Sequence, residues 1–142
     1  MDHVVFVDAK SKELEKILDG SKTTIIRGAA GRKLPHGRVN QGDMLYFIQN
    51  NAEGLILARA VVTAAFHSDK LSPQESEKLV ADRQITLQLE PAQVKRWAGK
   101  RYLVFVDIGQ VESMTPFAID RSAYSNMDDW LPVEEITKVR LD

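Results

Sequence analysis

Two segments rich in apolar and β-branched residues lie only four residues apart, and they constrain the fold more than any other feature. Asp43–Gln49 and Gly54–Phe66 have the composition of strands, and Asn50–Glu53 joins them. Four residues are enough for a hairpin but too few for the crossover connection that parallel neighbours need. The sequence therefore predicts adjacent antiparallel strands, the second of which is long enough to require a bend or a bulge.

Further strand-like segments lie towards both ends of the chain, mostly without helices between them. They are His3–Val7, Thr23–Arg27, Arg101–Gly109 and Val111–Thr115, the last two forming one strand with a corner at Gly109. This order predicts an α+β fold, with a small β-barrel of five or six mostly antiparallel strands and flanking helices. The length of 142 residues fits one domain, so we expect a single domain over residues 1–142.

The first helix is expected directly after the first strand. Leu14, Ile17 and Leu18 follow the spacing of one helix face, Ser11 is the expected cap, and Gly20 ends the helix.

The middle of the chain predicts two more helices. Residues 72–75 (Ser-Pro-Gln-Glu) form a capping box, and the helix that it opens is expected to run to about Arg83. Ile85–Leu89 fits either a strand or the approach to a short helix that Pro91 opens and Gly99 ends. The tail after residue 115 is expected to be irregular, with short strand-like pieces.

Composition removes several classes of function. The chain has no cysteine, which excludes a disulfide scaffold and a thiol nucleophile, and its three histidines are scattered. We therefore predict neither a metal nor a cofactor. The first residues do not resemble a signal peptide, and no apolar stretch is long enough to span a bilayer. We expect a cytoplasmic monomer that does not contact membranes.

The nearly neutral net charge of −1 hides an uneven distribution. Residues 20–42 contain five basic side chains and no acidic one, whereas the rest of the chain has fourteen basic and twenty acidic residues. A local basic patch on an acidic domain suits a small anionic ligand or a short stretch of nucleic acid. The alternative is a solvated loop that happens to be basic.

Three segments in order are similar to the ASCH family of PUA-like barrels. They are residues 20–27 (Gly-Ser-Lys-Thr-Thr-Ile-Ile-Arg), residues 42–47 (Gly-Asp-Met-Leu-Tyr-Phe) and residues 102–108 (Tyr-Leu-Val-Phe-Val-Asp-Ile). The resemblance extends over most of the chain. It implies a five- or six-stranded barrel whose cleft, between barrel and helices, binds RNA or a nucleotide.

The same resemblance implies an enzyme as an alternative. One branch of the family removes an acyl group from a modified cytidine with a lysine, a threonine and a glutamate, and another has been described as a ribonuclease. Gly20, Lys22 and Arg27 match the motif Gly-x-Lys-x-x-(Glu or Thr)-x-Arg. Ile25 occupies the acid or threonine position, and Thr24 is one residue out of register. Glu75, Glu77 and Asp82 are open candidates for the acidic partner.

The candidate ligand-binding residues come from the motif, the basic loop and three aromatic positions. They are Lys22, Thr23, Thr24, Arg27, Arg32, Lys33, Arg38, Tyr46, Tyr124 and Trp130, and Lys22 is also the candidate catalytic residue.

Each of these residues also has a structural interpretation. Lys22 can be a solvated lysine at a helix end, and Arg27 can pair with an acid across the sheet. Tyr46 alternates with core residues, and Trp130 can plug the barrel as part of a C-terminal strap.

The function that we predict is an RNA- or nucleotide-binding module with a basic cleft around Lys22 and Arg27. The first alternative is a small hydrolase that acts on a modified nucleoside or on RNA and uses Lys22. The second alternative is a protein-interaction domain whose basic loop meets an acidic partner.

Overall fold

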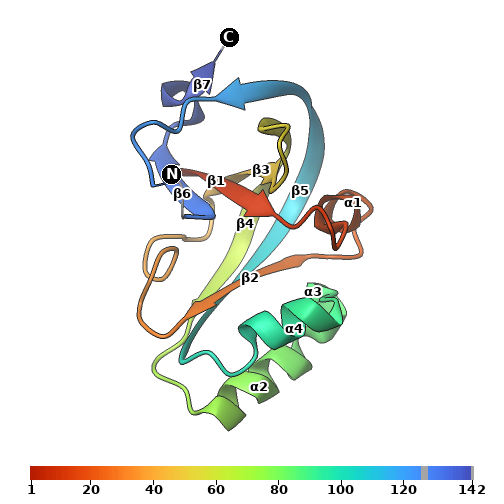
Figure 1. The fold of residues 1–142 in the computed structure, drawn as a ribbon, viewed down its shortest axis with the longest axis vertical. Coiled ribbons are helices and arrows are strands. Elements are labelled where there is room, and N and C mark those ends of the chain that lie inside the picture. Colours follow the sequence, from red (N-terminus) through yellow and green to blue (C-terminus); the bar gives the residue numbers. More distant parts are fainter. Residues whose placement is uncertain (126–127, 142) are drawn as a thin grey trace.

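The computed structural model describes residues 1–125 and 128–141. Its strands form one sheet that curls into a half-barrel (Figure 1). The strands are β1 (Asp2–Val7), β2 (Thr24–Ala29), β3 (Met44–Gln49), β4 (Leu55–His67), β5 (Tyr102–Ile119), β6 (Trp130–Glu134) and β7 (Arg140–Leu141). The helices are α1 (Glu13–Leu18), α2 (Pro73–Asp82), α3 (Gln84–Leu87), α4 (Pro91–Trp97) and the 3-10 helix η1 (Ile136–Lys138).

The strand order across the sheet is β2-β5-β4-β3-β1-β6, and β7 pairs with β5. The pair β1–β3 is parallel, and every other recorded pair is antiparallel. The predicted α+β fold with a small, curled β-barrel is therefore confirmed. The helices α2, α3 and α4 gather at one end of the sheet, next to β2 (Figure 1).

Bulges bend the two longest strands, as their length requires. Val61 pairs with Gly109, whereas Arg59 pairs with Glu112, so β5 carries one extra residue at the predicted corner. Gln110 takes a left-handed φ of 49° at that point. The predicted hairpin forms from β3 and β4.

The helices follow the sequence signals, with two corrections. Ser72 and Glu75 form the predicted capping box at the start of α2. Residues 84–87 form the helix α3, so the strand interpretation of Ile85–Leu89 is wrong. The expected Ser11 cap is also wrong, because Lys12 takes the N-cap position in a left-handed conformation and the Ser11 hydroxyl donates to Asp8 instead.

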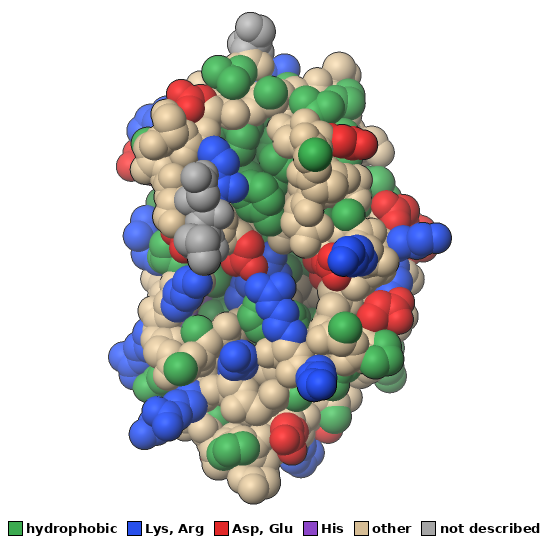
Figure 2. Space-filling model, in the orientation of Figure 1, with side chains coloured by type: hydrophobic (Ala, Val, Ile, Leu, Met, Phe, Trp, Pro, Cys, Tyr) green, Lys and Arg blue, Asp and Glu red, His purple; other side chains and the backbone are tan. Residues whose placement is uncertain are grey.

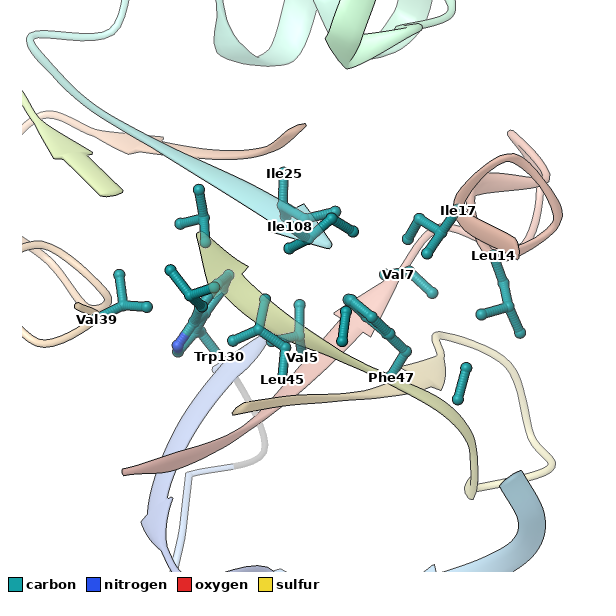
Figure 3. Packing of buried hydrophobic residues seen from close by; sticks show 14 of the residues in the cluster. Val5, Val7, Leu14, Ile17, Ile25, Val39, Leu45, Phe47, Ile108 and Trp130 are labelled. Atoms are coloured by element: carbon teal, nitrogen blue, oxygen red, sulfur yellow. The ribbon is translucent and has the colours of Figure 1, made fainter. Parts of the chain in front are cut away.

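The main core lies inside the curled sheet, and Trp130 lies among its side chains (Figure 3). The indole is 1% exposed, and its Nε1–H donates to Nδ1 of His3 over 3.0 Å. Since Nδ1 accepts, the proton of the neutral imidazole is on Nε2, which lies 2.8 Å from Oδ2 of Asp43. This chain of hydrogen bonds holds Trp130 as the plug of the barrel.

A second core cluster lies on the opposite side of β1 and β3. Tyr46 is 6% exposed there, with its ring edge-to-face with Phe117, and Tyr124 packs against the same cluster. In the described part of the chain, no helix is both long and apolar enough to cross a membrane.

The buried His3 predicts a loss of stability in mild acid. Burial lowers the pKa of His3, and the nearby Asp43 only partly opposes this. Below the ordinary value of about 6.5, the unfolded chain binds a proton that the folded chain does not, so stability falls as pH falls from 6.5 towards the lowered pKa. We expect a His3→Gln variant to lose less stability than wild type between pH 7 and pH 5 in urea denaturation. Parallel pH profiles would contradict this.

The close packing at Gly28 predicts a second effect on stability. A Cβ at this position would lie 2.9 Å from Cδ2 of Leu103 and 3.2 Å from Cβ of Lys100, whereas a Cβ at Gly31 would meet nothing within 4 Å. Gly28→Ala should therefore cost about 1–3 kcal/mol in urea denaturation. Gly31→Ala, the matched control, should be neutral or slightly stabilising. Equal effects of the two substitutions would contradict the packing argument.

Candidate functional site

A cleft lies between helix α4 and the strands β1 and β2, which each contribute residues to it. It consists of two pockets of about 280 and 310 Å³, which share four residues at their junction: Arg27, Arg96, Trp97 and Asp129. In Figure 2, lysine and arginine side chains gather around the hollow in the middle of the face, with acidic side chains beside them.

The two pockets differ in chemistry. The first, which we call the polar pocket, adds carboxylate, amide and aromatic side chains: Phe6, Asp8, Glu13, Asn50 and Gln93. The second, the basic pocket, adds Lys33, Leu34, Lys100 and residues 28–30. The cleft therefore changes from hydrogen-bonding groups at one end to cations at the other.

Arg27 is the fixed cation at the junction. Its Nη1 donates to the carbonyl of Ile26 over 2.7 Å, and its Nη2 donates to the carbonyl of Phe6 over 2.6 Å. The guanidinium also lies 5.8 Å from the ring of Trp97 and 5.6 Å from that of Trp130. Because carbonyls of β1 and of its own strand β2 accept its N–H groups and two indoles lie near it, the charge is held at one position in the cleft.

Arg96 is the exposed counterpart of Arg27. Its side chain is 61% exposed, and its guanidinium lies over the ring of Trp97, 4.3 Å from the centroid. Trp97 itself is mostly buried and lines both pockets. A rotation of Arg96 would expose an indole face inside the cleft.

A buried ion pair lies at the end of the polar pocket. The Lys22 amine is 3.4 Å from Oε2 of Glu13 and also donates to the carbonyl of Leu87. Glu13 lines the pocket, accepts the backbone N–H of Asp8 over 3.0 Å, and contacts Nε2 of Gln93 at 3.3 Å. Burial lowers the pKa of Lys22, and the carboxylate of Glu13 opposes that lowering. The acidic partner is thus Glu13, and none of Glu75, Glu77 and Asp82 contacts Lys22.

The structure brings only part of the predicted set to the cleft. Arg27 and Lys33 line it, whereas Lys22 is 1% exposed and lines neither pocket. Arg32 lies over the ring of Tyr102, and Arg38 lines neither pocket.

The two threonines of the motif lie outside the cleft. Thr24 is buried, donates to Asp107 over 2.6 Å and lies 2.9 Å from Thr86. Thr23 lines a separate pocket of about 590 Å³ together with Thr86 and Asp107. Lys22 and Thr24 therefore have different partners.

Helix α4 and the turn after it supply cleft residues that the motif does not contain. Residues 95–100 (Lys-Arg-Trp-Ala-Gly-Lys) carry Arg96, Trp97 and Lys100, and this mixture of basic and aromatic residues is a sequence signal for a nucleic-acid surface. Glu13 and Asp129 carry no comparable signal. The described residues hold no group of three or more His, Asp or Glu side chains arranged for a metal ion.

Comparison with known proteins identifies the fold. No protein-family model and no curated protein matches this sequence. Among solved structures, ASCH from Zymomonas mobilis superposes with a TM-score of 0.67 at 16% identity, over 96% of this chain and 92% of that one. Two mutant forms of that protein superpose with TM-scores of 0.66 and 0.67.

The buried pair predicts an asymmetric response to substitution. Lys22→Met leaves the Glu13 carboxylate buried without its cation, so it should cost about 3–5 kcal/mol of unfolding free energy. The double variant Lys22→Met/Glu13→Gln removes both charges and should recover a large part of that loss. Urea denaturation measures each variant.

The control for this experiment is Lys78→Met, which breaks the exposed pair of Lys78 with Asp82 and should change stability little. A double variant that is no more stable than Lys22→Met would contradict the charge argument.

Proposed function

We propose that this chain, which has the ASCH fold, binds RNA or a nucleotide-like ligand in the cleft between the sheet and α4. The single observation that carries the proposal is the junction of the two pockets at Arg27, Arg96 and Trp97. Cations beside an aromatic face are the combination that binds a phosphate and a base of one nucleotide.

The division of the cleft supports an orientation for the ligand. The polar pocket offers carboxylate acceptors and the side-chain amides of Asn50 and Gln93, which suit the hydrogen-bonding edge of a base. The basic pocket has Lys33 and Lys100 on its walls and suits the phosphates. A ligand with its base towards Glu13 and its backbone towards Lys100 matches both.

Lys22 has an indirect role in this proposal. Its amine lies 3.4 Å from Oε2 of Glu13, so it forms an ion pair with the carboxylate that lines the polar pocket without lining the pocket itself. The hydrolase alternative has less support, because Thr24 is engaged with Thr86 and Asp107 and does not contact Lys22.

Salt-dependent binding of a fluorescent RNA hexamer tests the proposal. We expect Lys100→Ala to weaken binding and to reduce the slope of log K against log salt by about 0.7, since one single-strand phosphate contact is lost. Fluorescence anisotropy gives both the affinity and the salt slope. The titrations run from about 50 to about 300 mM salt, because phosphate contacts weaken over this range.

The matched control is Arg38→Ala, an exposed basic residue of the same sequence patch that lies outside the cleft. It should leave affinity and slope close to wild type. Equal effects of the two variants would show that net charge alone drives binding. A wild-type protein that binds neither RNA nor mononucleotides would overturn the proposal and favour a protein partner.

A further inference from the structure

The carboxylate of Asp129 lies between the two guanidiniums at the junction of the cleft. Its Oδ2 is 3.3 Å from Nε of Arg27 and 3.5 Å from Nη2 of Arg96. Asp129 lines both pockets. The chain's own anion therefore occupies the place where the basic and the polar halves of the cleft meet.

Asp129 does not supply a hydrogen-bond acceptor for Nε of Arg27. The Arg27 side chain is 8% exposed, and its Nη1 and Nη2 donate to backbone carbonyls. Its Nε is buried and has no hydrogen-bond acceptor, because Asp129 is close enough for charge but not placed for a hydrogen bond. A buried donor without an acceptor is costly, so the site favours an anion that approaches Nε better than Asp129 does.

The Asp129 side chain is partly accessible to solvent. It is 36% exposed, and among the described residues it forms ion pairs with Arg27 and Arg96. The backbone at this residue is held separately, because its carbonyl accepts the N–H of Phe6 over 3.0 Å. Rotation of the side chain towards solvent would open the site while the backbone at Asp129 remains in place.

We propose that the space between Arg27 and Arg96 is a phosphate subsite, and that Asp129 is a built-in competitor which a phosphate group displaces. The proposal rests on the proposed function for its ligand, a phosphate of RNA or of a nucleotide. A phosphate has three acceptor oxygens and more charge than a carboxylate, so it can contact Nε and Arg96 together. Asp129 excludes weaker anions, because they would have to displace it without gaining those contacts.

Removal of the competitor tests this directly. In Asp129→Asn the subsite keeps both arginines and loses the negative charge, so inorganic phosphate should bind about tenfold tighter than to wild type at constant ionic strength. Asp128→Asn removes the same charge one residue away, where the structure shows no side-chain ion pair, and should bind like wild type. Titration calorimetry gives both affinities, and thermal melting checks that the variants are folded.

Nuclear magnetic resonance supplies a second readout on the wild-type chain. The Nε–H signal of Arg27, assigned by its loss in Arg27→Lys, should shift on titration with inorganic phosphate, because its donor gains an acceptor. An unchanged signal at saturating phosphate would overturn the subsite, as would equal phosphate affinities of Asp129→Asn and Asp128→Asn, or weaker binding by Asp129→Asn.

The RNA hexamer separates this inference from the proposed function. If wild type binds the hexamer and Asp129→Asn gains nothing over Asp128→Asn, the function stands and the subsite is wrong. If no variant binds the hexamer but Asp129→Asn gains affinity for inorganic phosphate, the subsite stands and the RNA-binding function is wrong.

Discussion

The buried guanidinium of Arg27 is the interaction on which the cleft depends. A cation removed from water costs several kcal/mol unless protein groups replace its hydration. Here backbone carbonyls of β1 and β2 take two of its nitrogens, and the indoles of Trp97 and Trp130 lie near it. One charge thus joins two strands, helix α4 and the start of β6, and each of these elements forms a wall of the cleft or lies behind it.

The cleft combines this fixed charge with groups that can adjust. Arg96 and Asp129 have exposed side chains, and the Asp129 carboxylate lies 3.3 Å from Arg27 and 3.5 Å from Arg96. Glu13 and Lys22, in contrast, are buried and form an ion pair. Under the proposed function, a ligand meets a buried polar end, a buried central cation and the more exposed ion pair of Arg96 with Asp129. Rearrangement of that exposed pair would move side chains that solvent already reaches.

The sequence predicts most of the fold because the relevant signals are local. Hairpin spacing, the capping box at Ser72 and the strand composition of 101–115 each act within a few residues, and each leads to the observed element. The misassignments also have local causes: α3 is too short for its periodicity to be diagnostic, and Lys12 takes a left-handed cap that no sequence rule predicts. The parallel pairing of β1 with β3 depends on topology, which strand composition does not encode.

The site is less predictable because its residues are brought together by tertiary contacts. The motif identifies Arg27 and the charged patch identifies Lys33. Both criteria depend on one continuous segment of the sequence, so neither can identify residues that lie far apart in the chain. Glu13 reaches Lys22 from the first turn of α1, where it also accepts the backbone N–H of Asp8, and Asp129 reaches Arg27 from a segment more than a hundred residues away in the chain.

The link between motif and cleft is the residue that follows Arg27. Gly28 pairs with Leu103, and the absence of a Cβ lets Lys100 and Tyr102 approach its backbone closely. The end of α4 lies against β2, where Trp97 is 5.8 Å from the guanidinium and Arg96 contacts the same Asp129 carboxylate as Arg27. Two adjacent residues therefore have complementary roles: Arg27 supplies the charge at the centre of the cleft, and Gly28 allows the close approach that places the aromatic and basic wall next to it.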